Sequence, residues 1–237
     1  MTFKLNTVNL TVFKNISQGK PFMPKAPRNP DEIFMVKKRI LDAALDILSE
    51  QGFHSLSMRK IANRTKMTAA NLYNYFSNKD EIYLAIQTRG FELLVQRFQK
   101  IDQTAAAPLD KIRRMIRAYI DFGIHYPDQY EIMFTRNTPK FSDYVGTSLE
   151  PAATVEKQTA LQLAQIAVTV ILTMHETVTP GIAEDAMYRT TQVWTALHGV
   201  VSLLNSRVLQ EVEQDTDGMV DKLAEELLLP FHRQDKP

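Results

Sequence analysis

The chain has 237 residues, 44% of them hydrophobic, which is enough for one large domain or two small ones. It contains no cysteine, and this excludes a disulfide framework, thiol catalysis and cysteine-based zinc sites. The net charge of +1 conceals a division, because residues 1–80 carry +7 and residues 81–237 carry −6. Either the basic end of the chain meets a polyanion, or its lysines cluster there by chance.

Neither a membrane span nor a secretion signal is predicted. The most apolar stretch, residues 161–174, is interrupted by Gln and Thr and is shorter than the roughly 18 apolar residues of a membrane helix. The lysines near the N-terminus are followed by no continuous apolar block, as a signal peptide would require. We therefore expect a cytoplasmic protein that does not interact with membranes.

Residues 1–30 form a segment with five basic and no acidic side chains. Its prolines recur at every third position from Pro21 to Pro30, which favours an extended linker, and residues 8–12 alternate weakly like a strand. Three interpretations remain open. The segment is a basic arm that follows DNA phosphates, or a disordered tail, or a stretch preceding a natural start at Met23 or Met35.

From Asp31 onward the sequence predicts helices only. Apolar side chains recur every three or four residues up to Leu48, and Gly52 ends this first helix. Ser57 and Thr68 are the caps of two short helices, over residues 58–65 and 69–76. Longer helices follow over 78–101, 108–124, 150–177, 182–209 and 217–229, with a short helix after Pro127 and a loop at 138–151. The predicted fold is all-α.

The second short helix has the pattern of a DNA recognition helix. Leu72 and Phe76 lie four residues apart and must face the core. Small side chains at the start of the opposite face allow a close approach to base edges in a major groove. Lys79 adds a positive charge where the next helix begins and favours a phosphate. The exposed face consists of Ala69, Ala70, Tyr73 and Asn74.

Residues 31–82 resemble the DNA-binding domain of the TetR family of regulators. The resemblance lies in the sequences ILDAA (40–44), GF (52–53), SMRKIA (57–62), TAANLYNYF (68–76) and KDEI (79–82). It implies a helical homodimer with an N-terminal helix-turn-helix domain over 31–82 and a ligand-binding and dimerisation domain over 83–237. It also implies base contacts from Ala69, Ala70 and Tyr73, and phosphate contacts from Ser57, Thr68, Asn74, Tyr75 and Lys79.

Two positions depart from the family pattern. Lys66 stands in the turn where the family usually has Gly, and Ala70 replaces another common Gly. A lysine held at positive φ costs on the order of 1 kcal/mol, but its charge adds a candidate phosphate contact. Arg59, on the outer face of the first short helix, is a further candidate. For Tyr75 a place in the aromatic core is the alternative to a DNA contact.

Two segments of the second domain also resemble the family. Residues 119–134 are similar to the middle of the TetR-type ligand domain, and VWTALHG (193–199) resembles the Trp-x-x-x-His-Gly signature of one C-terminal subclass. We expect His198 to make a structural hydrogen bond between helices. Either a ligand cavity or ordinary core packing accounts for the large apolar side chains. The candidate ligand contacts are Phe122, Tyr126, Met133, Phe134, Met174 and Trp194.

The sequence predicts a ligand-responsive repressor. The apolar helices over 186–204 and 220–228 either pair with their copies in a homodimer or fill the core of the monomer. A dimer would bind a palindromic operator in double-stranded DNA and be released by a small, largely apolar effector. We expect no cofactor, metal or catalytic residue, since no such motif is present. The alternatives are a helical interaction protein or an enzyme that uses the same fold without DNA.

Overall fold

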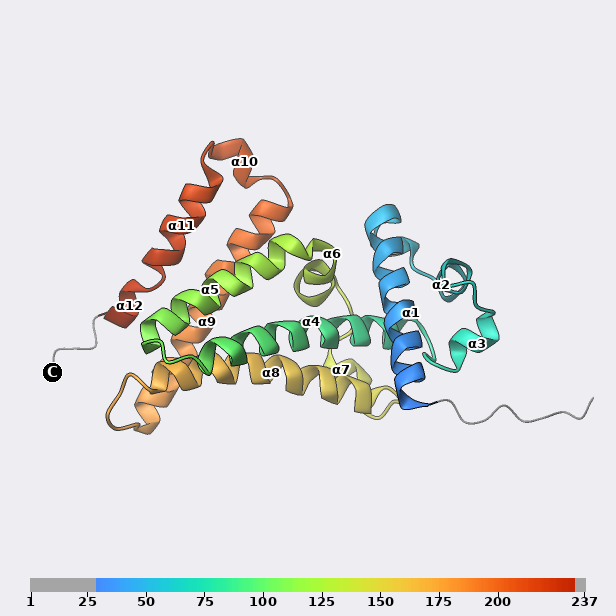
Figure 1. The fold of residues 1–237 in the computed structure, drawn as a ribbon, viewed down its shortest axis with the longest axis horizontal. Coiled ribbons are helices and arrows are strands. Elements are labelled where there is room, and N and C mark those ends of the chain that lie inside the picture. The colour runs from blue at the N-terminus through green and yellow to red at the C-terminus, as the bar shows by residue number, and fades with distance from the viewer. Residues whose placement is uncertain (1–28, 233–237) are drawn as a thin grey trace, which may run out of the picture.

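The computed structural model describes residues 29–232, and within that range it contains helices and turns and no strand. The prediction of an all-α fold is confirmed. The weak strand signal at residues 8–12 and the proline-rich linker lie outside the described residues. Figure 1 shows a small group of helices, α1 to α3, at one end of a longer bundle.

The first helices begin at the residues that the sequence indicates. They are α1 (Pro30–Gln51), η1 (Phe53–Ser55), α2 (Met58–Arg64) and α3 (Ala69–Tyr73). The Ser57 hydroxyl accepts a hydrogen bond from the Lys60 amide at 3.3 Å, and the Thr68 hydroxyl accepts one from the Asn71 amide at 3.2 Å. These bonds satisfy amide groups that would otherwise have no partner in the first turn of each helix.

Helix α3 is shorter than predicted, because it ends at Tyr73 and not at Phe76. The amides of Tyr75 and Phe76 both donate to the carbonyl oxygen of Leu72, at 2.9 and 3.2 Å, and this closes the helix in a tight turn. Leu72 and Phe76 are nevertheless buried, as the sequence predicts.

The rest of the chain is a bundle of long helices joined by short ones. Three helices end earlier than predicted: α8 at Leu172 and not near residue 177, α9 at Asn205 and not at 209, and α11 at Glu226 and not at 229. A short helix also lies within the predicted loop 138–151. The elements are α4 (Lys79–Asp102), α5 (Pro108–His125), α6 (Pro127–Tyr130), the π-helix η2 (Glu131–Thr135), α7 (Phe141–Tyr144), α8 (Glu150–Leu172), α9 (Pro180–Asn205), α10 (Leu209–Val212), α11 (Thr216–Glu226) and α12 (Leu229–His232).

Helix α4 belongs to two hydrophobic cores. Its first turns, with Ile82 and Ile86, pack in a core formed with α1, α2 and α3. Its later turns, with Leu94, pack in a larger core formed with α5, α8 and α9. Figure 1 shows α4 running from the small helical group into the bundle, with α8 beside it. The small group and the bundle are therefore joined by one continuous helix.

The π-helix η2 also joins the two cores. Ile132 is 2% exposed and packs in the core of α1 to α3, whereas its neighbour Met133 packs in the core of the bundle. No helix among the described residues is long and apolar enough to cross a membrane.

Candidate nucleic-acid interface and ligand cavity

Helix α3 presents a small, exposed face. Leu72 is fully buried and anchors the helix, and Tyr73, next to it, is 52% exposed. The side chains of Ala69, Ala70 and Asn74 are exposed as well. This distribution follows from helical periodicity, because one apolar residue per turn fixes which side turns outward.

The turn before α3 contains the strained lysine that the sequence predicts. Lys66 has a φ of 55°, a conformation that glycine adopts more readily. The Met67 amide donates to the Ala62 carbonyl at 2.8 Å, and the Thr65 hydroxyl donates to the Ile61 carbonyl at 2.8 Å. Lys66 itself is exposed.

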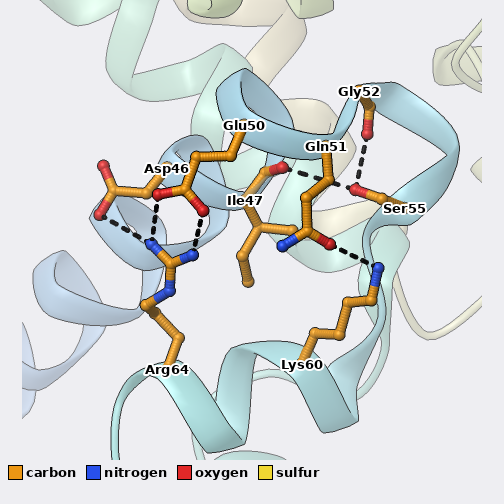
Figure 2. A network of polar contacts seen from close by, with 8 residues as sticks. All are labelled: Asp46, Ile47, Glu50, Gln51, Gly52, Ser55, Lys60 and Arg64. Atoms are coloured by element: carbon orange, nitrogen blue, oxygen red, sulfur yellow. Dashed lines mark hydrogen bonds and ion pairs between the residues drawn. The ribbon is translucent and has the colours of Figure 1, made fainter.

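Two cations of α2 bind the end of α1 (Figure 2). Arg64 donates to both carboxylate oxygens of Glu50, one of them at 3.0 Å, and lies 3.9 Å from a carboxylate oxygen of Asp46. Lys60 donates to the side-chain oxygen of Gln51 at 2.7 Å. The hydrogen bond from Arg64 lowers the pKa of the Glu50 carboxyl. These two cations hold α2 on α1, and Arg64 uses both of its terminal nitrogens to do so.

The remaining cations around α3 are exposed. Arg59, Lys66 and Lys79 form no ion pair with another described residue. Arg39 on α1 is equally exposed and lies at a groove between α1 and α3 that Asn71 also lines. The sequence analysis missed Arg39, because its position beside α3 depends on how the two helices cross. These four positive charges lie on α1, on α2, in the turn before α3 and at the start of α4.

Of the other predicted DNA contacts, Ser57 and Thr68 lie at helix caps, whereas Tyr75 is buried. Ser57 and Thr68 each use a hydroxyl oxygen to cap a helix, which leaves the hydroxyl hydrogen able to bind a phosphate. Tyr75 is only 7% exposed and its ring packs in the core of α1 to α3. The ring of Tyr75 therefore supports α3 from beneath.

A cavity of about 420 Å³ lies in the bundle between α4, α5, η2, α8 and α9. Three of the six predicted ligand contacts line it: Met133, Phe134 and Trp194. The sequence analysis missed the lining residues of α4, α5 and α8, since nothing in a helical apolar pattern distinguishes a cavity wall from a filled core. These include Phe91, Phe98, Met115, Tyr119, Ala160 and Leu163.

The other three predicted contacts do not line this cavity. Phe122 is fully buried in the core of the bundle, with its ring 5.4 Å from that of Tyr126. Tyr126 follows the end of α5, where it is 41% exposed and lies under the guanidinium of Arg97. Met174 lies beyond the end of α8 and packs against the edge of the core.

Two regions of the chain match models of known families. Residues 40–86 match the bacterial regulatory proteins of the tetR family, and residues 112–227 match the tetracyclin repressor-like C-terminal domain. The chain belongs to the TetR family. The two matches include just over half of α1, all of α2 and α3, and, around the cavity, most of α5 together with η2, α8 and α9, but not the part of α4 that carries Phe91 and Phe98.

One relative of this TetR-family chain is the HTH-type transcriptional activator FasR of Mycolicibacterium smegmatis. The two are 31% identical over 121 residues, which are 51% of this chain and 52% of FasR. The chain therefore spans about half the length of this relative.

Solved structures have the same fold. SCO4313 superposes with a TM-score of 0.68 at 20% identity and covers 85% of this TetR-family chain and 99% of its own. The transcriptional regulator FadR from Bacillus subtilis, solved in complex with stearoyl-CoA, has a TM-score of 0.59 at 15% identity, covering 81% of this chain and 97% of its own.

Few polar groups lie at the cavity of this TetR-family chain. The hydroxyl of Tyr119 accepts a hydrogen bond from Nε1 of Trp194 at 3.1 Å and lies 3.1 Å from the hydroxyl of Tyr130. The Tyr130 hydroxyl lies 2.8 Å from Nδ1 of His198, which confirms the predicted hydrogen bond between helices. Burial raises the pKa of Tyr119 to about 12 and also raises that of Tyr130, so both keep their protons at neutral pH.

The remaining polar lining falls into two groups. The hydroxyls of Thr190 and Thr191 donate to carbonyl oxygens of their own helix, at 2.8 and 2.9 Å. Lys140 and Glu156 also line the cavity. Burial raises the pKa of the Glu156 carboxyl, and the charge of Lys140 partly opposes this. The rest of the wall is apolar or aromatic.

Proposed function

We propose that the chain is a ligand-responsive transcriptional repressor that binds a palindromic operator as a homodimer and is released by a small molecule. The exposed face of α3 carries this proposal, because its small side chains are open to solvent and the segments next to it in the chain carry the exposed cations Arg59, Lys66 and Lys79. Residues 31–82 would bind DNA, and residues 83–237 would bind the ligand and the second subunit. Catalysis is no part of this function.

The proposed DNA contacts divide by chemistry. Ala69, Ala70 and Tyr73 would lie nearest the base edges, since two small side chains let α3 approach the major groove. The phosphate contacts would be Ser57, Arg59, Lys66, Thr68, Asn74 and Lys79, with Arg39 added from α1. Tyr75 would contribute by holding α3 in place.

The proposed dimer interface lies on the outer side of α9. Ala186, Leu197 and Val201 fill the core of the monomer, as one of the two interpretations from sequence requires. On the opposite side of α9, five residues spaced three or four apart lie in one row. Four of them are exposed, and a Cβ atom at the fifth, a glycine, would meet nothing within 4 Å. The row consists of Tyr188, Gln192, Thr195, Gly199 and Leu203.

The proposed response to ligand uses η2. Met133 lines the cavity, and Ile132 packs with the helices that carry α3. The side chain of Gln87 in α4 donates to the Ile132 carbonyl at 3.1 Å, and that of Gln129 donates to the Ile86 carbonyl at 3.0 Å. A ligand that displaces Met133 would thereby move the start of α4. Couplings of this kind are typically about 1–3 kcal/mol, or roughly 5- to 150-fold in affinity.

The cavity supports a largely apolar effector. The structure of FadR was solved with stearoyl-CoA, a molecule with a long apolar chain, and this shows that a protein of the same fold binds such a ligand. Whether the bound dimer represses or activates transcription depends on the position of its operator. One relative, FasR, is named an activator. The direction of regulation follows from where the dimer lies relative to a promoter.

Selection from random double-stranded DNA by the purified full-length chain tests this function. We expect enrichment of inverted repeats whose half-site centres lie about 34–36 Å apart, one turn of DNA, or a multiple of this. Enrichment without an inverted repeat would contradict the dimer. No enrichment at all would contradict DNA binding and favour an interaction protein or an enzyme on the same fold.

A further inference from the structure

Trp194 and His198, the tryptophan and the histidine of the VWTALHG sequence, form the two ends of one hydrogen-bonded chain of side chains. They lie four residues apart and so one turn apart on α9. The chain runs from Trp194 through Tyr119 and Tyr130 to His198, with distances of 3.1, 3.1 and 2.8 Å. We call these four residues the aromatic relay. Trp194 and Tyr119 line the cavity, whereas Tyr130 and His198 do not.

Counting protons gives the aromatic relay two arrangements in which the Tyr130 hydroxyl proton is itself bonded within the relay. The indole of Trp194 can only donate, so Tyr119 accepts from it in both. If Nδ1 of His198 carries no proton, Tyr130 donates to it and Tyr119 donates to Tyr130. If Nδ1 carries the proton, it donates to Tyr130, Tyr130 donates to Tyr119, and the hydroxyl proton of Tyr119 is left without an acceptor in the relay.

The content of the cavity decides between these arrangements. Tyr119 is 3% exposed, and a buried donor without a partner is destabilising. The empty cavity therefore favours the arrangement in which Tyr119 donates to Tyr130. A hydrogen-bond acceptor in the cavity beside Tyr119 favours the reverse, because it supplies the missing partner.

We propose that the cavity selects an apolar molecule with a carbonyl oxygen, and that the aromatic relay presents the Tyr119 hydroxyl proton to that oxygen. The proposal rests on the proposed function, since it names the chemical class of the effector. The hydroxyls of Thr190 and Thr191 do not compete, because each already donates within α9. Tyr130, which immediately precedes η2, exchanges its donor and acceptor roles when the ligand binds.

Trp194 is the single tryptophan of the chain, so its fluorescence reports on the cavity directly. Two probes of similar length are titrated into the full-length protein without DNA. Methyl nonyl ketone carries the carbonyl oxygen, and undecyl chloride is the apolar probe that lacks it. The measured quantity is the ratio of the two dissociation constants in the wild type and in each variant.

Tyr119→Phe removes the donor, and we expect it to weaken ketone binding by about tenfold or somewhat less while chloride binding is unchanged. Thr190→Val is the matched control, because it deletes a cavity hydroxyl that donates only to its own helix, and it should leave the ratio unchanged. Tyr130→Phe removes the acceptor that engages Tyr119 in the empty protein. It should therefore tighten ketone binding a few-fold, which a merely structural tyrosine would not do.

The proposal is overturned if the wild type binds no ketone, if Tyr119→Phe keeps the wild-type ratio, or if Tyr130→Phe binds the ketone no more tightly than the wild type. These outcomes are separate from the proposed function. A failed relay leaves the selection of operator DNA unaffected, and a failed selection leaves the ketone-to-chloride ratio unaffected.

Discussion

The backbone of Gly90 in α4 lies directly against the thioether sulfur of Met133 in η2, so that a Cβ atom at position 90 would overlap it. This close approach holds η2 on α4 at the point where the two hydrophobic cores meet. Position 90 thus requires glycine because Met133 occupies the place of a Cβ atom, and not because the backbone has a positive φ.

The variant Gly90→Ala should force Met133 towards the cavity that it lines. We expect a loss of about 1 kcal/mol in the free energy of unfolding, at the lower end for overpacking because methionine is flexible. Urea denaturation measures it. Met133→Ala in the same chain should remove the overlap, so the double variant should be more stable than the sum of the two single changes predicts. Simple additivity would show that the contact is not tight.

The positive φ of Lys66 predicts a stabilising substitution. Lys66→Gly should raise the free energy of unfolding by about 1 kcal/mol, because glycine adopts this conformation without a Cβ clash. Lys66→Ala is the control, since it removes the same charge but keeps the Cβ atom. Equal stability of the two variants would show that the turn carries no such strain.

The ion pair between Arg64 and Glu50 predicts a pH dependence. The pKa of Glu50 is lowered, so its contribution to stability is present above the ordinary glutamate pKa of 4.5 and is lost as pH falls through the lowered value. Glu50→Gln should therefore be less stable than the wild type at neutral pH and equally stable in acid. Glu184→Gln, at an exposed position on α9, should differ at neither pH. A difference for Glu50→Gln that persists in acid would contradict this role.

The open space at Gly199 predicts a substitution that acts only on assembly. A Cβ atom there meets nothing within 4 Å in the monomer, so Gly199→Arg should fold normally. In the proposed dimer it would lie in the interface and should shift the equilibrium to monomer in analytical ultracentrifugation. Gly181→Arg is the matched control, because its surroundings on α9 are equally open. A dimer that tolerates Gly199→Arg would place the interface elsewhere.

The sequence predicted the local features of the DNA-binding end well. Ser57, Thr68 and Gly52 act on the adjacent turn of chain, so their caps and stops can be read without knowing the tertiary structure. The outward side of α3 could be predicted because Leu72 must face the core, which leaves the opposite side exposed. The positive φ of Lys66 was predicted from the resemblance to a family with glycine at that position.

The cavity was predicted less well, because it depends on helices that are distant in the sequence. Phe122 and Phe134 are both large and aromatic, yet one fills the core and the other lines the cavity. Which of the two side chains reaches the cavity depends on how α5, η2, α8 and α9 pack against one another. The same holds for Arg39, whose position near α3 is set by the packing of α1, and for the π-helical turn that separates Ile132 from Met133.

The central claim is that the exposed face of α3 reads DNA, and operator affinity of Tyr73→Ala tests it most directly. Tyr73 is 52% exposed and its loss should leave the fold intact. The control is Tyr126→Ala, an exposed tyrosine at the end of α5. Against the operator selected from random DNA, we expect Tyr73→Ala to bind at least about tenfold more weakly and the control to bind like the wild type. Unchanged affinity of Tyr73→Ala would contradict the account.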